Sequence, residues 1–130
     1  MQDEQDVLLL HTGEESGDSL VRAVGDIDLS TTPQLRQAVE ETIARLPTDG
    51  ELRYMVLDIR EVPFIDSAGL ALLVEIRKRF HNTCRLAVLI AASTQPERVL
   101  RLGRFDTFLI IGYSLEELHS SGVGAKLVAA

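Results

Sequence analysis

The chain has 130 residues, the length of one domain, and 45% of them are apolar, which is enough to form a buried core. The net charge of −7 argues against a nucleic-acid-binding protein, which needs a basic surface. The longest apolar runs, at 68–74 and 86–92, are far shorter than the roughly 20 residues of a membrane-spanning helix, so we expect no membrane insertion.

Cys84 is the only cysteine, so the chain cannot form an intrachain disulfide. This composition fits a reducing cytoplasm, and it predicts that Cys84 is a small buried side chain. The acidic segment 1–6 lacks the basic and apolar regions of a signal peptide, so we expect a cytoplasmic protein.

The first part of the chain predicts a hairpin followed by a helix. Residues 7–12 and 19–24 have the pattern of strands, separated by a polar, acidic turn at 13–18. Thr31 and Gln34 have the spacing of a capping box, and Pro33 stands in the first turn of the helix. The apolar residues of this helix recur every 3.6 positions, at Leu35, Ala38, Val39, Ile43 and Leu46.

The second part alternates strands and helices. Residues 54–59 and 84–91 are nearly continuous in apolar residues, as in strands covered on both faces, and a helix ending near Phe80 lies between them. A short helix at 94–102, a strand within 105–111 and a helix at 114–118, where Ser114 and Glu117 have capping-box spacing, complete the chain. This order predicts a small α/β sandwich with a mixed sheet of about five strands and about four helices. We expect a single domain over residues 1–130, with loose tails at 1–6 and 122–130.

The segment 62–70 (Val-Pro-Phe-Ile-Asp-Ser-Ala-Gly-Leu) predicts a turn from a buried strand into a helix. Asp66 and Ser67 are both residue types that cap helix N-termini. The Ser67 hydroxyl would then lie near solvent at the positive end of the helix dipole, where a phosphate is electrostatically favoured. Strands followed by capped helices are common in α/β proteins, so this turn alone favours a purely structural role.

The helix after this turn has two different sides at 100° per residue. The side assigned to the core carries Gly69, Leu72, Leu73, Ile76 and Phe80. The opposite side carries Ser67, Leu70, Ala71, Val74, Lys78 and His81. A helix that faces only water is charged on its outer side, although scattered apolar residues occur on most surfaces. We therefore interpret this side as a protein-binding face with Ser67 at its edge.

Three segments together resemble the STAS family, named for sulfate transporters and anti-sigma factor antagonists. Gly-Asp-Ile-Asp at 25–28 is similar to the segment before the family's first helix. Residues 56–59 followed by 64–70 are similar to its third strand and phosphorylation turn, and 102–108 with 114–117 are similar to its closing region. The resemblance covers nearly the whole chain.

The resemblance implies a single-domain anti-sigma factor antagonist, with neither enzymatic activity nor a cofactor. Ser67 would be the phosphoacceptor, with Asp28 near it on the neighbouring loop and Asp66 orienting the turn. The unphosphorylated form would sequester an anti-sigma factor that is also a serine kinase with a histidine-kinase-like ATPase fold, which frees a sigma factor, and a PP2C-type phosphatase would restore that form. With the helix face, the implied partner-binding residues are Asp28, Asp66, Ser67, Ala68, Gly69, Leu70, Ala71, Val74 and Lys78. Ala68 departs from the family, which usually has Ser or Thr there.

Other functions have less support in the sequence. A serine nucleophile needs a base and an oxyanion hole, but there is no Gly-x-Ser-x-Gly motif, and no motif links His11, His81 or His119 to Ser67. No Cys/His cluster predicts a metal site, and residues 66–69 are too short a signal for a phosphate-binding loop, which leaves nucleotide binding a minor alternative. The main alternative is a non-switched STAS scaffold subunit of a transporter or stress-signalling complex. Self-association through the apolar helix face also stays open.

Overall fold

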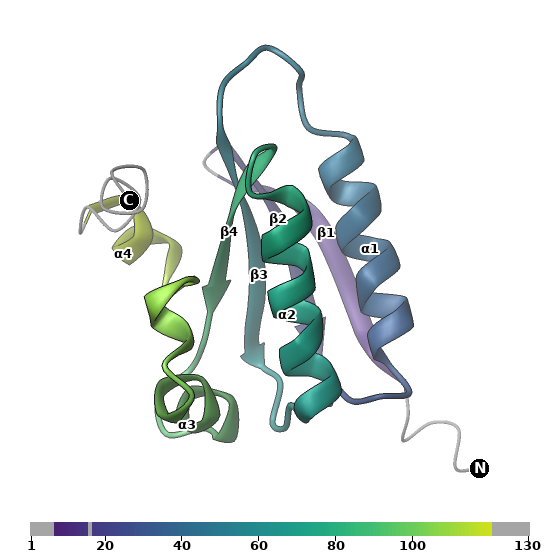
Figure 1. The fold of residues 1–130 in the computed structure, drawn as a ribbon, viewed down its shortest axis with the longest axis vertical. Helices are drawn as coiled ribbons and strands as arrows, with labels where there is room; N and C mark the ends of the chain where they lie inside the picture. Colours follow the sequence, from purple (N-terminus) through teal and green to yellow (C-terminus); the bar gives the residue numbers. More distant parts are fainter. Residues whose placement is uncertain (1–6, 16, 121–130) are drawn as a thin grey trace.

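The computed structural model describes residues 7–15 and 17–120 (Figure 1). In chain order its elements are β1 Leu9–Glu15, β2 Asp18–Val24, α1 Thr32–Ala44, β3 Arg53–Glu61, α2 Ser67–Phe80, β4 Cys84–Leu89, α3 Gln95–Leu102, a 3₁₀ turn Phe105–Thr107, β5 Ile110–Gly112 and α4 Leu115–Ser120. None of the helices in these residues has the length and apolar character needed to cross a membrane.

The five strands form one mixed sheet in the order β1-β2-β3-β4-β5, which is also their order in the chain. Strands β1 and β2 pair antiparallel as a hairpin, whereas β2, β3, β4 and β5 are parallel neighbours. Each parallel pair requires a crossover connection, and these connections contain α1, α2 and α3. With four α-helices in the described residues, the structure confirms the predicted α/β fold and its mixed sheet.

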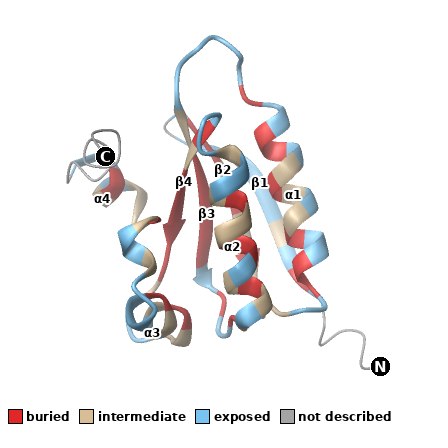
Figure 2. Ribbon diagram, in the orientation of Figure 1, coloured by how far each residue is buried: buried red, intermediate tan, exposed pale blue. Residues whose placement is uncertain are grey.

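The main hydrophobic core lies between the sheet and the layer formed by α1 and α2, which run side by side over one face (Figures 1 and 2). Helix α2 contributes Leu72, Leu73 and Ile76, each only 1% exposed. A smaller buried cluster joins the opposite face of the sheet to α4, and its members are Val56, Ala87, Leu89, Ile110 and Leu118. Strands β3 and β4 are therefore covered on both faces, as their continuous apolar sequences predict.

Salt bridges join α1 to α2 on the outer surface of the helix layer. Arg36 donates two hydrogen bonds to Glu75, at 3.0 and 2.9 Å, and Arg79 donates to Glu40 at 2.5 Å. Because these side chains are still more than a third exposed to water, the pairs contribute little to the free energy of folding. The alignment of the two helices therefore depends mainly on the apolar residues beneath them.

Two local predictions are wrong. The acidic segment expected as a turn belongs largely to the hairpin strands, because β1 continues to Glu15 and Glu14 and Glu15 pair with β2 on an exposed edge strand, where charged side chains reach water. Thr31 and Gln34 do not form a capping box: the Thr31 hydroxyl accepts from the Asp28 N–H at 2.9 Å, and Gln34 donates to the Leu8 carbonyl at 2.7 Å. Thr31 therefore stabilises the loop before α1, and Gln34 joins α1 to the residue before β1.

Other local predictions are confirmed. Ser114 accepts from the Glu117 N–H at 3.0 Å at the start of α4, as its capping-box spacing predicts. Cys84 is buried at the start of β4, which ends at Leu89 rather than at residue 91. The tails expected at 1–6 and 122–130 lie outside the described residues.

Asp58 is a buried carboxylate in the middle of the sheet. It pairs in register with Leu89 and is only 4% exposed. Burial alone would raise the pKa of Asp58, but hydrogen bonds from Arg60, at 2.9 Å from both Nε and Nη2, outweigh burial and hold the pKa below its ordinary value of 3.8. Asp58 therefore stabilises the folded state as a carboxylate.

We expect acid to remove this contribution. A carboxyl group with a lowered pKa in the folded state adds stability above the unfolded pKa, and that stability disappears as the pH falls through the folded pKa. Asp58→Asn should therefore be less stable than the native chain at pH 7. The difference in stability between the two proteins should become smaller once the pH falls below 3.8, the ordinary pKa of an aspartate. Urea denaturation of both proteins between neutral and acidic pH checks this, and a difference independent of pH would contradict it.

Gly69 is required by packing in the first turn of α2. A Cβ at this position would lie 2.5 Å from Ile65 Cγ1 and 2.8 Å from Ile27 Cγ2, both on buried residues. In an open helix Gly→Ala stabilises by up to about 1 kcal/mol. Overpacking a core costs typically about 1–3 kcal/mol, so the clash dominates here.

Gly69→Ala should accordingly lower the free energy of unfolding, contrary to ordinary helix propensity. Chemical denaturation followed by circular dichroism measures the effect. Gly13→Ala is the matched control, because a Cβ there meets nothing within 4 Å, and it should change stability by less than about 0.5 kcal/mol. Equal midpoints for Gly69→Ala and the native chain would refute the packing argument.

Candidate protein-binding site around Ser67

Ser67 is the first residue of α2 and is exposed. It is not the helix cap: Asp66 takes that position, in extended conformation, and its Oδ1 accepts from the Gly69 N–H at 3.0 Å. Both residues were candidates for the cap on sequence grounds, and the structure assigns it to Asp66. In the described part of the chain the Ser67 hydroxyl has no hydrogen-bond partner, so it is available to an external group.

Asp66 also connects two loops. Its Oδ2 accepts from the Leu29 N–H at 3.2 Å, in the loop between β2 and α1. The backbones of these loops pair as well: Ile27 donates to the Phe64 carbonyl at 2.9 Å, and Asp66 donates to the Ile27 carbonyl at 3.1 Å. The loop before α1 and the turn before α2 therefore form one unit at the carboxyl ends of β2 and β3.

Asp28 organises its own loop. Its Oδ1 accepts from the Ser30 hydroxyl at 2.7 Å and from the N–H groups of Ser30 and Thr31 at 3.0 and 3.1 Å. The bond from the Ser30 hydroxyl is the main reason that the pKa of Asp28 lies below its ordinary value. Asp28 thus keeps its negative charge on the loop beside the Ser67 turn, with no direct hydrogen bond to Ser67.

The outer side of α2 is arranged as its periodicity predicts, with one difference. Ala71 and Lys78 are exposed, and Val74 is half-buried. Leu70 is also half-buried and packs partly against the main core, so the apolar patch is smaller than the sequence indicates. Gly69 is buried on the core side of the helix, where it supports the surface and is not part of it.

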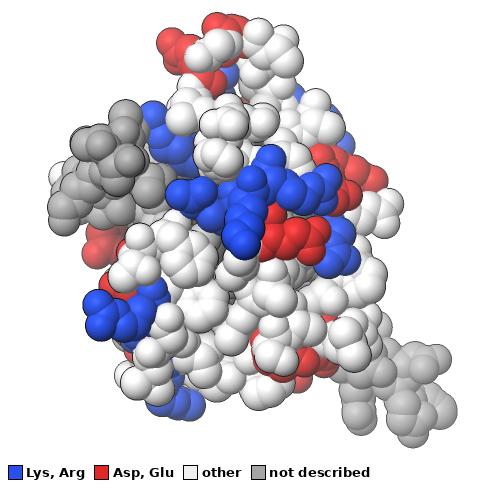
Figure 3. Space-filling view, in the orientation of Figure 1, with Lys and Arg blue, Asp and Glu red and all other residues white. Residues whose placement is uncertain are grey.

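Charge is distributed unevenly along α2. Lysine and arginine side chains gather over its C-terminal half, whereas the surface over its N-terminal half, nearer Ser67, is mostly uncharged (Figure 3). The last turn contains Arg77, Lys78 and Arg79, close to the negative end of the helix dipole. A partner that covers the Ser67 end of α2 therefore meets a mostly uncharged surface, with basic side chains on one side and a small acidic group on the other (Figure 3).

Three residues near Ser67 were missed by sequence reasoning. Leu29 is 75% exposed and Phe64 is 44% exposed, each in one of the two paired loops. Single apolar residues in loops have no periodicity that would distinguish surface from core. The third is Gln95, the first residue of α3, whose side chain contacts the backbone of Ile65. Because Gln95 lies 30 residues after Ile65 in the chain, no short-range sequence pattern predicts this contact.

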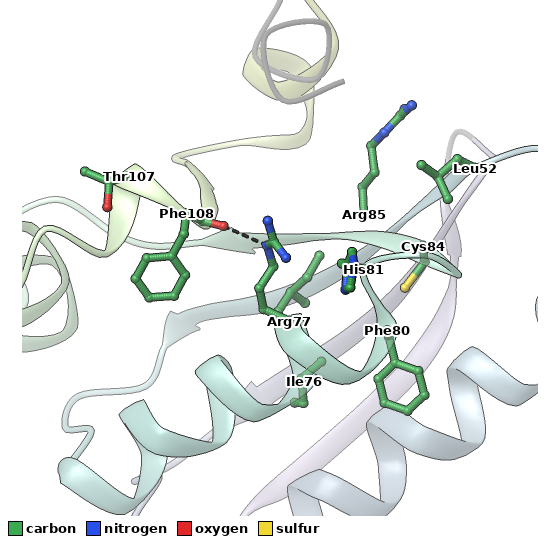
Figure 4. A pocket seen from close by; sticks show the side chains of 10 residues that line it. Leu52, Ile76, Arg77, Phe80, His81, Cys84, Arg85, Thr107 and Phe108 are labelled. Carbon is green, nitrogen blue, oxygen red and sulfur yellow. Dashed lines mark hydrogen bonds between the residues drawn. The ribbon is translucent and has the colours of Figure 1, made fainter. Parts of the chain in front are cut away.

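A cavity of about 330 Å³ lies at the opposite end of α2 (Figure 4). Ile76, Phe80 and Phe108 supply much of its apolar lining, and Arg77 Nε donates to the Phe108 carbonyl at 3.0 Å. Cys84 also lines it, but burial raises the pKa of this thiol to about 11, so it is protonated at neutral pH. The cavity does not include Ser67, and it offers no activated nucleophile.

Catalytic groups do not gather around Ser67. His119 contacts Asp18 at 2.7 Å and His81 contacts the Lys78 carbonyl at 3.1 Å, both away from the turn. Across residues 7–15 and 17–120 there is no group of three or more His, Cys, Asp or Glu side chains suited to a metal ion.

Comparison with known proteins agrees with this description. The STAS domain model matches residues 11–118. The anti-sigma-F factor antagonist RsfB of Mycobacterium tuberculosis is 24% identical over 121 residues, which make up 93% of this chain and 92% of that protein. Among solved structures, an anti-sigma factor antagonist from Mycobacterium paratuberculosis superposes with a TM-score of 0.75 at 22% identity, covering 95% of this chain and 96% of the other. The Bacillus cell fate determinant SpoIIAA in its phosphorylated form superposes with a TM-score of 0.54 at 15% identity, covering 86% and 96%. With a family model spanning most of its length and the corresponding fold, the chain belongs to the STAS domain family.

Proposed function

We propose that this protein is an anti-sigma factor antagonist, a binding module without enzymatic activity that is switched by phosphorylation of Ser67. The observation that carries the proposal is the exposed, unbonded Ser67 hydroxyl at the start of α2, next to an uncharged helix face. Family membership supports it, as do relatives named anti-sigma factor antagonists, among them SpoIIAA, which was solved in unphosphorylated and phosphorylated forms.

The proposed partner is an anti-sigma factor that is also a serine kinase with a histidine-kinase-like ATPase fold. Unphosphorylated, the protein binds this partner and so frees a sigma factor. Phosphorylation of Ser67 by the same kinase ends the binding, and a PP2C-type phosphatase removes the phosphate. A surface hydroxyl is suited to this cycle because both enzymes need direct access to the oxygen.

The docking surface consists of the exposed and half-buried side chains around that hydroxyl. Its members are Leu29, Phe64, Ser67, Ala68, Leu70, Ala71, Val74 and Lys78. Asp66 and Asp28 hold the loops beneath it and place two carboxylates beside Ser67. The surface is thus apolar at its centre, acidic in its supporting loops and basic towards the end of α2.

A phosphate on Ser67 opposes binding for a physical reason. It adds a charge of about −1.5 to −2 at neutral pH. In the free protein, water and the N-terminal N–H groups of α2 stabilise this charge. In the complex the charge loses its water, and it repels any carboxylate of the partner that lies opposite it. A penalty of about 3 kcal/mol weakens binding roughly 150-fold.

Substitution of Ser67 tests the switch. Ser67→Asp should weaken binding to the anti-sigma partner, because it places a charge at the edge of the docking surface. Ser67→Ala should bind with native affinity, and the partner kinase with ATP should not be able to abolish that binding. Isothermal titration calorimetry measures both affinities. Ser120→Asp is a charge-matched control on α4, and it should leave the affinity unchanged.

Intact mass spectrometry after incubation with the partner kinase and ATP tests the modification itself. One phosphate should be added to the native chain and none to Ser67→Ala. If both chains stay unmodified, and Ser67→Asp binds as tightly as the native protein, the protein is a STAS scaffold that is not switched at Ser67.

Leu29 tests the extent of the docking surface. Leu29→Ala removes an exposed apolar side chain from a loop bonded to Asp66, and it should weaken partner binding about 5- to 30-fold, as expected for an interface anchor worth about 1–2 kcal/mol. Leu102→Ala is the matched control, since Leu102 is 79% exposed on α3 and outside the docking surface. Equal affinities for the two variants would remove Leu29 from the interface.

A further inference from the structure

Ile65 lies two residues before Ser67, and the backbone of the neighbouring loop pairs with it on one side only. It forms an isolated parallel bridge with Ile27. In this bridge the Ile27 N–H donates to the Phe64 carbonyl, and the Asp66 N–H donates to the Ile27 carbonyl. In this parallel pattern the N–H and C=O of Ile65 itself point to the opposite side. Since Ile65 is 1% exposed, these two groups need other partners.

The side chain of Gln95 supplies both partners. Its Oε1 accepts from the Ile65 N–H at 2.9 Å, and its Nε2 donates to the Ile65 carbonyl at 3.0 Å. A primary amide carries one acceptor and donors in the same plane, so it can replace the peptide group of a neighbouring strand. The segment before Ser67 is therefore held like the middle strand of a sheet, by Ile27 on one side and by Gln95 on the other.

Gln95 is itself held by the start of α3. Thr94 caps this helix, accepting from the Glu97 N–H at 3.3 Å, and Glu97 Oε1 accepts from the Ser93 N–H at 2.9 Å. Ser93 has a φ of 65°, a left-handed conformation that is unfavourable for this residue type and kept by these bonds. The other carboxylate oxygen of Glu97 accepts from the Tyr113 hydroxyl at 2.5 Å, which connects this end of α3 to the residue after β5. The backbone that carries the Gln95 side chain is thus held in place by these hydrogen bonds.

We propose that Gln95 is a positioning residue for the Ser67 turn: its amide keeps residues 65–67 in the conformation that presents the hydroxyl on the docking surface. The importance of this role for binding and phosphorylation rests on the proposed function. The effect of Gln95 on the conformation of the turn does not depend on any partner. The alternative is that Gln95 only attaches α3 to the rest of the molecule. In that case its loss would leave the Asp66 and Gly69 hydrogen bonds intact.

Amide hydrogen exchange measured by NMR separates these roles. The informative groups are the Asp66 N–H, bonded to the Ile27 carbonyl, and the Gly69 N–H, bonded to Asp66 Oδ1, because Gln95→Ala removes neither acceptor. If Gln95 positions the turn, both should exchange roughly tenfold faster relative to the Val88 N–H of the core strand β4, reflecting two lost hydrogen bonds. Gln37→Ala is the control, because Gln37 is exposed on α1 and its side chain donates to Glu41 of the same helix.

An isosteric variant strengthens the experiment. Gln95→Glu keeps an acceptor for the Ile65 N–H but at neutral pH turns a carboxylate oxygen, which cannot donate, towards the Ile65 carbonyl, so the two acceptors repel and both amides should again exchange faster than in the native chain. Both variants should also bind the anti-sigma partner more weakly and accept phosphate more slowly.

The outcomes distinguish the two proposals. Native exchange rates at Asp66 and Gly69 in Gln95→Ala overturn the positioning role, whatever the partner affinity. Faster exchange supports it, and if Ser67→Asp and Gln95→Ala then bind the partner as well as the native chain does, the proposed function fails while the positioning role stands.

Discussion

The parallel pairing of β2, β3 and β4 is the constraint on which the candidate site depends. Parallel neighbours end at the same edge of a sheet, so the loops that follow them must meet there. At this edge the backbone of Ile27 bonds the turn before α2, and Asp66 bonds the loop before α1. A hydroxyl at residue 67 is therefore supported from both sides by parts of the chain that are distant in sequence, and it can stay exposed without being loosely held.

Helix α2 meets two requirements that ordinarily conflict. One side must bury enough apolar surface to attach the helix to the sheet, and Leu72, Leu73 and Ile76 do so. Under the proposed function, the other side must keep enough exposed apolar surface to bind a protein. The structure meets both requirements by half-burying Leu70 and Val74, which limits the exposed apolar patch, and by placing Arg77, Lys78 and Arg79 in the last turn of the same helix.

Sequence reasoning worked where one local rule dominated. Continuous apolar segments identified β3 and β4, and helical periodicity identified the buried and exposed sides of α2. It was wrong for Thr31 and Gln34, whose spacing fits a capping box although their side chains bond Asp28 and Leu8. It was also wrong for the acidic segment after residue 12, because polarity alone does not distinguish a turn from an exposed edge strand.

The sequence by itself determined the α/β class, the core-facing side of α2 and the presence of a serine at the strand-to-helix turn, because these follow from periodicity and from the preferences of residues for local conformations. Only the tertiary structure decided that Asp66 rather than Ser67 caps the helix, that Leu29 and Phe64 are exposed on the two loops paired at the Ser67 turn, and that Gln95 completes the pairing of Ile65. The contacts of Leu29 and Gln95 depend on hydrogen bonds between residues 30 or more positions apart, which no short-range pattern records. The cap was undecided because Asp66 and Ser67 are neighbours that suit the position equally well, and only the backbone conformation selects one of them.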